Sequence, residues 1–383
     1  MMTAGTHTIV TEHFARSVTA TTRFFEADSR RVAECCRRMA DHFTGGGALF
    51  VVGEGAQASD AQHVAVEFVH PVIVGKRALP AVWVTDVAAS SSDIVMGLAT
   101  DVVPPLVTTT LAAAHARGAL TILITGSAPQ PALAADFHFR IDDANPLVIQ
   151  EVSETLYHVL WELVHVFFET DDAHLMAFLP QSAGSQQVDL IAEVQASTIA
   201  KARDICALRT AIEERSGFRI LAAAHAVAER VRSNGQLLAF GNGGSATDAQ
   251  DVAADCLAAP LSGWRRLRAM ALTNDVSVIT AIGNDVGFDH VFSRQVIAFG
   301  RAADVAIGFS TSGASRNLAA AMTEARSRGL LTIALSGGDG GEMARSSAVD
   351  FCFTAPSDHL PRIQEAHATI WHALLSVVQE ALR

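Results

Sequence analysis

Short runs of apolar residues alternate along the chain with longer stretches in which apolar positions recur at helical spacing. Two of these stretches, 12–43 and 190–233, show the period of an amphipathic helix. Each is followed by a short apolar run, at 48–52 and at 236–240, that ends in a glycine-rich turn. We expect a strand at each run and a helix directly after each turn.

Further apolar runs follow both glycine-rich turns, and stretches of helical character separate them. They lie at 81–84, 94–98 and 121–124 in the first half, and at 269–272, 305–309 and 332–335 in the second. Runs that are apolar on both faces are typical of parallel strands with helices on both sides. The pattern therefore predicts an α/β fold with one doubly wound parallel sheet in each half.

The two halves are copies of one another. Residues 53–62 align with residues 241–250 at an offset of 188, whereas residues 149–151 align with 363–365 at an offset of 214. The second copy therefore carries an insertion of about 26 residues. The predicted organisation is a domain at 1–180, a small polar linker at 181–189 and a domain at 190–383.

Composition restricts the class of protein. Of the 383 residues, 50% are apolar and 18% are charged, which indicates a large buried core or interface. The net charge of −12 argues against a nucleic-acid partner. No apolar run approaches the roughly 20 residues of a membrane helix, and no signal-peptide pattern begins the chain, so we expect a cytoplasmic protein without a membrane partner.

The glycine-rich turns are candidate anion sites. A strand that runs into such a turn and then a helix surrounds a small cavity with backbone N–H groups and the positive end of a helix dipole. Sharp turns alone also explain such glycines. The second copy adds a loop at 310–315, Ser-Thr-Ser-Gly-Ala-Ser, whose hydroxyls and amides can donate to phosphate oxygens.

Five motifs follow one another along the second copy: GNGGS at 241–245, GNDVGFD at 283–289, STSGAS at 310–315, SGGDGG at 336–341 and RIQEAH at 362–367. Together they resemble the sugar isomerase (SIS) domain family, and within it the bacterial phosphoheptose isomerases, which interconvert sedoheptulose 7-phosphate and heptose 7-phosphate. The first copy resembles the same family more distantly. The resemblance implies two flavodoxin-like, three-layer αβα domains in tandem.

The resemblance also implies residue roles in the second copy. The residues expected to bind the substrate's phosphate or sugar are Asn242, Gly243, Ser245, Asp285, Ser310, Thr311, Ser312 and Ser315. The first copy departs from this pattern, because Glu54 and Asp101 stand in the corresponding loops. We therefore expect that the first copy does not bind phosphate by itself.

A possible metal site is implied by the same resemblance, since several relatives hold zinc with a His, a Glu, a Gln and a second His. In the first copy these positions are His63, Glu67, Gln150 and His158, a set that suits zinc. The alternative is two ordinary helices with inward polar residues. In the second copy the positions are Asp251, Asp255, Gln364 and His372, which favours a harder ion or no metal.

Two functions remain open from the sequence. The first is an aldose–ketose isomerase with Asp255 or Glu67 as the base, His372 or His158 as the acid or metal ligand, and Gln364 beside them, in a site that can draw on both copies. The second is a phosphosugar-binding regulator or accessory protein that no longer catalyses. In either case the resemblance implies a phosphorylated sugar as ligand, no nucleotide cofactor and a homodimer that imitates the family's tetramer.

Overall fold

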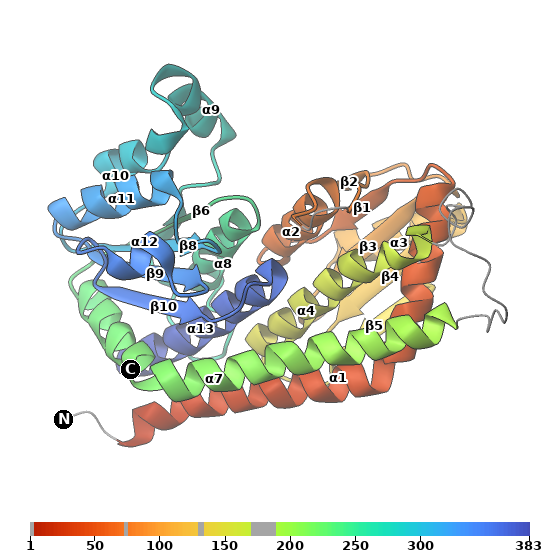
Figure 1. Cartoon of the computed structure of the whole chain (residues 1–383), viewed down its shortest axis with the longest axis horizontal. Coiled ribbons are helices and arrows are strands. Elements are labelled where there is room, and N and C mark those ends of the chain that lie inside the picture. The colour runs from red at the N-terminus through yellow and green to blue at the C-terminus, as the bar shows by residue number, and fades with distance from the viewer. Residues whose placement is uncertain (1–3, 73–75, 129–133, 170–188) are drawn as a thin grey trace, which may run out of the picture. The chain divides into compact units, whose positions relative to one another are not determined.

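A computed structural model of the chain describes residues 4–72, 76–128, 134–169 and 189–383 (Figure 1). These residues form two five-stranded sheets in which all the strands are parallel. The first sheet has the order β2-β1-β3-β4-β5 and the second has the order β10-β9-β8-β6-β7. In the reverse direction the second order is β7-β6-β8-β9-β10, which corresponds strand by strand to the first. Both sheets therefore have the flavodoxin-like strand order 2-1-3-4-5. The predicted fold class is confirmed.

The strands lie where the apolar runs predict them, with two additions at the sheet edges. Strands β5 and β10 have no counterpart in the prediction, because their few residues mix apolar with polar side chains. The first sheet consists of β1 (Leu49–Val52), β2 (Ala81–Trp83), β3 (Ile94–Leu98), β4 (Leu120–Thr125) and β5 (Phe137–Arg140); the second consists of β6 (Leu237–Gly241), β7 (Ala269–Ala271), β8 (Val305–Ser310), β9 (Leu331–Gly337) and β10 (Phe351–Ala355).

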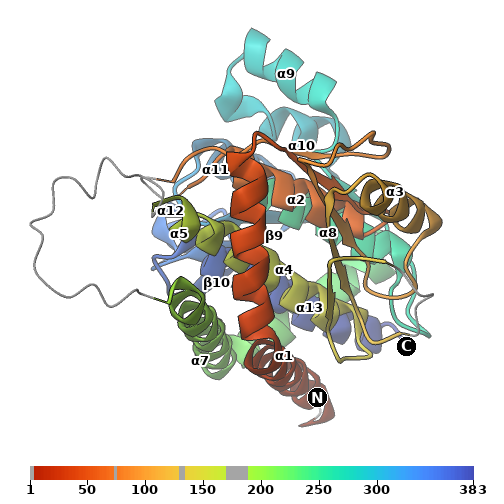
Figure 2. The ribbon, with the colours of Figure 1, turned by 90° about the vertical axis from the view of Figure 1, so that its right-hand side faces the viewer.

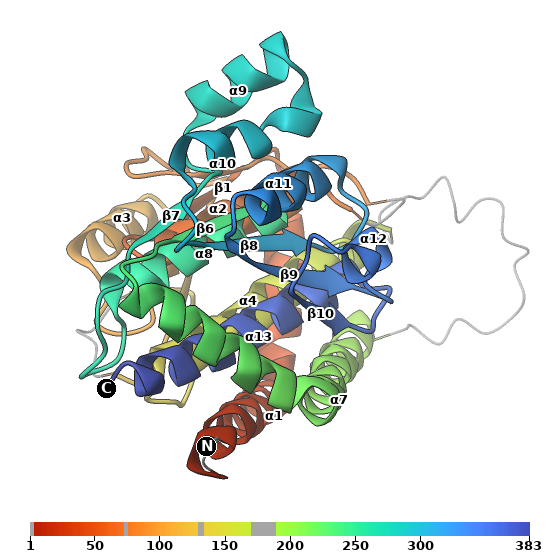
Figure 3. The same cartoon turned by 90° about the vertical axis from the view of Figure 1, so that its left-hand side faces the viewer.

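Helices cover both faces of each sheet. On the first sheet α1 (Ala4–Thr44), α2 (Gln57–Val69) and α4 (Pro146–Val164) share one core, and α3 (Pro105–Ala116) packs in another (Figure 2). A short α5 (Val166–Glu169) follows α4. On the second sheet α7 (Leu190–Arg232), α8 (Gly244–Ala258) and α13 (Leu360–Ala381) cover one face. Helices α10 (Ser293–Phe299), α11 (Arg316–Ser327) and α12 (Gly341–Arg345) cover the other (Figure 3).

The chain divides into two compact units. The first-sheet unit comprises Ala20–Asp204, and the second-sheet unit comprises Met1–Thr19 together with Ile205–Arg383. The start of α1 belongs to the second-sheet unit because Val10 and Phe14 are part of its core, and because Thr11 donates to Glu213 of α7 at 2.7 Å. The predicted linker at 181–189 lies, apart from its last residue, outside the described residues.

The insertion predicted in the second copy is visible as extra helices. Between β7 and β8 lie α9 (Val276–Asp285), the short helix η1 (Phe288–His290) and α10. The first-sheet unit has no helix between β2 and β3, in the described stretch 84–93. The insertion therefore adds a structured element to one copy only.

Candidate functional site

The second-sheet unit has a topological switch point between β6 and β8. These strands are neighbours, but the chain leaves β6 toward β7 on one side and later returns to β8 on the other. In open parallel sheets, ligands bind beyond the carboxyl ends of the strands at such a point, because the two loops diverge and leave a crevice. The turn after β6 and the serine loop after β8 both lie there.

The turn after β6 requires glycine at two positions. A Cβ on Gly241 would lie 2.1 Å from the carbonyl oxygen of Ser245, so the strand can approach the helix only without a side chain there. Gly243 has φ of 57°, a left-handed conformation that other residues rarely adopt. Helix α8 begins at the next residue, and Ser245 is buried in its first turn. The predicted phosphate ligand Ser245 therefore sits at a helix N-terminus.

The serine loop is held by its own hydroxyl groups. The Oγ atoms of Ser310 and Ser315 lie 3.1 Å apart, and the Gly313 N–H donates to Ser310 Oγ at 3.1 Å. The Ala314 N–H donates to Ser312 Oγ at 3.2 Å. Ser310 is buried, whereas the Ser312 side chain is exposed. The loop thus presents Ser312 outward from a fixed base, and the half-buried Thr311 lies beside it.

A pair of asparagines joins the two loops. Asn242 Nδ2 donates to Asn317 Oδ1 at 3.0 Å, and Asn317 Nδ2 donates to Asn242 Oδ1 at 2.9 Å. Asn242 follows β6, and Asn317 lies in the first turn of α11. Sequence reasoning missed Asn317, since its partner lies 75 residues away and no local pattern marks the pair. The pair fixes the spacing of the two walls of the crevice.

Asp285 ends α9, inside the inserted segment. It is exposed, and Asn284 Nδ2 donates to its Oδ1 at 2.9 Å. Nearby in sequence, Asp289 pairs with Arg316 at the start of α11 at 2.6 Å, which ties η1 to the end of the serine loop. The inserted segment is thereby anchored beside the crevice.

A second group of candidate site residues in the second-sheet unit surrounds Asp255. This carboxylate is buried at the end of α8, and its Oδ2 accepts a hydrogen bond from Trp371 Nε1 at 2.9 Å. His372 Nε2 lies 3.5 Å from the same oxygen. Gln364 is buried two turns earlier on α13, whereas Asp251 is half-buried one turn earlier on α8. Trp371 was not predicted as a site residue.

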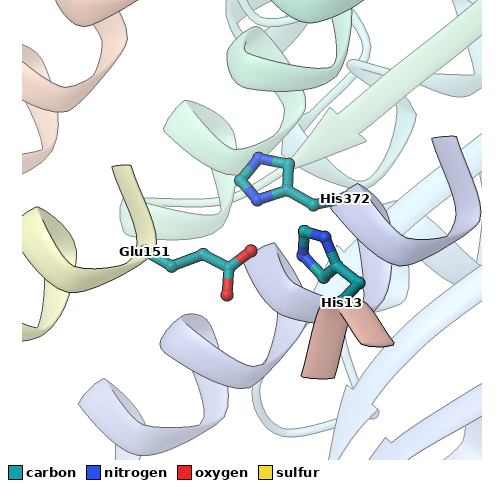
Figure 4. A group of neighbouring side chains, drawn as sticks. All are labelled: His13, Glu151 and His372. Carbon is teal, nitrogen blue, oxygen red and sulfur yellow. The ribbon is translucent and has the colours of Figure 1, made fainter. Parts of the chain in front are cut away.

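His13 of α1 also lies beside this group. Its ring centroid is 6.1 Å from that of His372, in an edge-on arrangement at 71° (Figure 4). Sequence reasoning missed His13 because α1 begins before the stretch that carries the family motifs. Among the described residues, Asp251 and Asp255 are in no cluster of three ligands close enough to share a metal ion.

The predicted metal ligands of the first copy lie in the first-sheet unit. His63 of α2 and His158 of α4 face each other with their Nε2 atoms 3.4 Å apart, and Glu67 Oε1 lies 3.6 Å from His63 Nε2. Glu154, which sequence reasoning missed, forms a close cluster with the two histidines. Gln150 is buried one turn before Glu154 on the same helix. The structure thus brings His63 and His158 together as predicted, and it adds Glu154.

The two loops at the switch point of the first-sheet unit carry exposed carboxylates. Its switch point lies between β1 and β3, by the same strand order. Glu54 and Asp101 stand exposed in the two loops, where the second-sheet unit has Asn242 and the serine loop. Two carboxylates disfavour an anion, so these loops are consistent with the loss of phosphate binding.

One further titratable residue, His367, packs against β8, the strand that precedes the serine loop. His367 of α13 is fully buried, with its ring centroid 6.0 Å from that of Phe309 in β8. Burial lowers the pKa of His367 from 6.5 to about 4, against the smaller opposing effect of the Ser336 backbone. The imidazole is therefore neutral at neutral pH, and it acts as a packed part of the helix.

Fold and site together define a class: a doubly wound α/β protein with a glycine-rich turn and a serine loop at a switch point. Residues 188–337 match the SIS domain family. The phosphoheptose isomerase of Roseiflexus sp. (strain RS-1) is 42% identical over 193 residues, which are 50% of this chain and 93% of that protein. That of Geobacter sulfurreducens is 46% identical over 172 residues, 45% of this chain and 90% of that protein. The chain belongs to the SIS domain family.

A likeness in fold extends over the whole chain. The C-terminal domain of glucosamine-fructose-6-phosphate aminotransferase from Francisella tularensis has a TM-score of 0.64 and covers 98% of this chain and 96% of its own, at 10% identity. A putative phosphosugar isomerase from Silicibacter pomeroyi has a TM-score of 0.58, 97% coverage of both chains and 11% identity. At such low identity these likenesses show the fold alone.

None of the helices in the described part of the chain combines the length and the apolar character that crossing a bilayer needs.

Proposed function

We propose that the chain is a sugar-phosphate aldose–ketose isomerase that resembles sedoheptulose 7-phosphate isomerase. The observation that carries the proposal is the serine-lined crevice of the second-sheet unit, in the half of the chain that is 42% identical to a phosphoheptose isomerase. The substrate is a phosphorylated heptose or ketose, and no nucleotide cofactor is involved. We further propose a cytoplasmic homodimer without nucleic-acid or membrane partners.

We assign phosphate binding to the crevice between β6 and β8. Ser310 and Ser315 fix the loop, while Ser312, Thr311 and the backbone N–H groups at the start of α8 donate to the phosphate oxygens. Hydrogen bonds to a charged acceptor contribute about 1.5–3 kcal/mol each, so a few of them are enough to hold the anion without a lysine. Asn242 and Asp285 are the proposed contacts of the sugar.

We assign proton transfer to Asp255 and His372. Asp255 takes the proton from the carbon beside the carbonyl and returns it to the neighbouring carbon, so that an enediol forms and collapses to the isomeric sugar. His372, 3.5 Å from the same carboxylate oxygen, exchanges protons with the enediol oxygens. Trp371 holds the carboxylate by its 2.9 Å hydrogen bond. Gln364, buried on the same helix, orients the substrate.

Zinc is the proposed metal, and it belongs to the first-sheet unit. The 3.4 Å separation of the His63 and His158 Nε2 atoms, with Glu154 close to both, supports this assignment. When bound, zinc would supply Lewis acidity at that cluster. Glu67 and His158 are therefore assigned to metal binding and proton transfer in that unit, together with Gln150.

Proton exchange tests the proposal. The full-length protein is incubated with sedoheptulose 7-phosphate in deuterated water and followed by NMR. Deuterium should enter beside the carbonyl, and Asp255→Asn should abolish this exchange without abolishing substrate binding. Ser327→Ala, an exposed position at the end of α11, is the control. Line broadening of the substrate without deuterium entry would reject the isomerase and leave a phosphosugar-binding regulator.

A further inference from the structure

Asn317, in the first turn of α11, makes two reciprocal hydrogen bonds with Asn242 in the turn after β6. Each side-chain amide donates to the oxygen of the other, at 3.0 and 2.9 Å. Asn317 is 3% exposed, whereas Asn242 is half-buried. We propose that Asn317 is a positioning residue, which holds the Asn242 amide in one orientation for hydroxyl groups of the sugar. The inference rests on the proposed function in one respect, that Asn242 contacts the sugar.

The start of α11 decides which way round the Asn317 amide lies. The first N–H groups of a helix have no acceptor within the helix. One of them, the Leu318 N–H, donates to Asn317 Oδ1 at 3.0 Å. A backbone N–H needs an oxygen opposite it and not an NH2 group, so Oδ1 and Nδ2 of Asn317 are fixed in place. The atom of Asn242 that meets Asn317 Oδ1 must then be its Nδ2.

The pair leaves Asn242 with a defined donor and a defined acceptor. A side-chain amide carries two N–H donors and an oxygen with two lone pairs. The pair uses one donor and one lone pair of Asn242, and no described residue makes a polar contact with the others. A sugar hydroxyl can both donate and accept, so it can use either. An amide without such a partner is free to turn over and exchange them, whereas Asn242 is ordered before the sugar binds.

The first-sheet unit has neither member of the pair. Helices α3 and α11 follow the corresponding strands β3 and β8, and Leu106 and Asn317 are each the second residue of their helix. Glu54 stands where the second-sheet unit has Asn242. Both amides are therefore replaced in the copy whose loop at 99–104 contains no serine. Leucine at the equivalent helix position also indicates that the fold accepts an apolar side chain there, which makes Asn317→Leu a suitable test.

Binding tests the inference apart from isomerase activity. Calorimetric titration of the full-length protein with sedoheptulose 7-phosphate compares the wild type, Asn242→Ala, Asn317→Leu and the double variant. Each single variant should weaken binding by roughly 2–10-fold, the effect of one neutral hydrogen bond. The double variant should bind as Asn242→Ala does, within about twofold, because Asn317 acts through Asn242. Inorganic phosphate, which has no sugar, should bind all four proteins within about twofold, since the serine loop keeps its own hydrogen bonds.

An aspartate at position 317 gives a measurement that a purely structural role would not change. When protonated, its carboxyl group can donate to Asn242 Oδ1 and accept from Asn242 Nδ2, as the asparagine does. When ionised, it cannot donate and places an oxygen opposite the Asn242 oxygen. The affinity of Asn317→Asp for sedoheptulose 7-phosphate, relative to the wild type at the same pH, should therefore recover as the pH falls. That of Asn317→Leu should stay at a constant fraction of the wild-type value.

Three results would overturn the inference. They are additive losses in the double variant, an equal loss of inorganic phosphate binding in Asn317→Leu, and a loss in Asn317→Asp that is the same at every pH. A wild type that binds inorganic phosphate but no sedoheptulose 7-phosphate would instead reject the proposed substrate, and the inference with it. A wild type that binds this sugar phosphate without isomerising it would reject the enzyme alone and leave the role of Asn317 to the binding data.

Discussion

The indole N–H of Trp371 donates a 2.9 Å hydrogen bond to Oδ2 of Asp255, and the same oxygen lies 3.5 Å from His372 Nε2. One oxygen therefore faces two ring nitrogens from adjacent positions of α13. An aspartate has one methylene fewer than a glutamate, so its carboxylate has less reach. The tryptophan fixes where this shorter side chain points.

Removal of this hydrogen bond should impair turnover more than binding. In Trp371→Phe we expect kcat to fall by roughly 10–100-fold, because a displacement near 1 Å of a catalytic group has an effect of this order. KM should stay within about a factor of two, since the proposed phosphate site lies at the serine loop and not at Trp371. Steady-state kinetics of the isomerase reaction measure both.

Trp161→Phe is the control for the loss of packing. Trp161 is fully buried in α4, and its indole N–H has no hydrogen-bond partner among the residues that the structure describes. An equal loss of kcat in both variants would show that Trp371 acts only through packing.

The hydroxyl of Ser312 should contribute to the binding of phosphate. Ser312→Ala removes an exposed donor from a loop that Ser310 and Ser315 still hold together. A lost hydrogen bond to a charged group of about 1.5–3 kcal/mol corresponds to roughly 10–150-fold in the dissociation constant of a sugar phosphate. Calorimetric titration measures it. Unchanged affinity in this variant would place the phosphate outside the serine loop.

Gly313 is the position where the serine loop tolerates no side chain. Its φ is 64°, and an added Cβ would lie 2.3 Å from the backbone oxygen of Gly340. Gly313→Ala should therefore lower the free energy of unfolding by several kcal/mol and abolish phosphate binding. Gly338→Ala is the matched control, because Gly338 has a similar φ of 58° but nothing within 4 Å of an added Cβ. It should cost only about 1–2 kcal/mol. Chemical denaturation compares the two.

His367 should make the fold sensitive to acid. Its pKa in the folded protein is about 4, against 6.5 for an exposed imidazole, because burial disfavours the charged ring. Between these values the unfolded chain binds more protons, so stability rises with pH there. The contribution is present above pH 6.5 and is lost as the pH falls toward 4.

The size of this effect is on the order of 3 kcal/mol, from the conversion of pKa differences to free energy. In His367→Gln the unfolding free energy should depend less on pH over the same range, which denaturation at several pH values would detect. A pH profile identical to that of the wild type would show that other groups account for the acid sensitivity.

The sequence predicted most of the framework because its signals are local. The buried strands are continuous apolar runs. The turns after β1 and β6 are predicted from their glycines alone, since glycine is the residue that readily adopts a positive φ. The duplication predicted an insertion in the second copy, and the structure shows α9, η1 and α10 between β7 and β8. Strands β5 and β10 were not predicted, because polar side chains interrupt their apolar residues.

The site was predictable only where a motif named its residues. The roles of the serine loop and of the pair His63 and His158 follow from the resemblance of their motifs to the family. Glu154 and Trp371 were not predicted, because each depends on which face of a helix meets which neighbour across the core. The partner of Asn242 likewise lies 75 residues away, at Asn317.

By itself, the sequence determined the fold class, the two copies and the loss of hydroxyls from one of them, since these follow from side-chain type and local periodicity. Tertiary structure alone decided that Trp371 holds Asp255, that Glu154 joins the two histidines, and that the first turns of α1 belong with the second sheet. Such contacts depend on how helices are rotated against a shared core, and that rotation is set by the packing of many distant side chains at once.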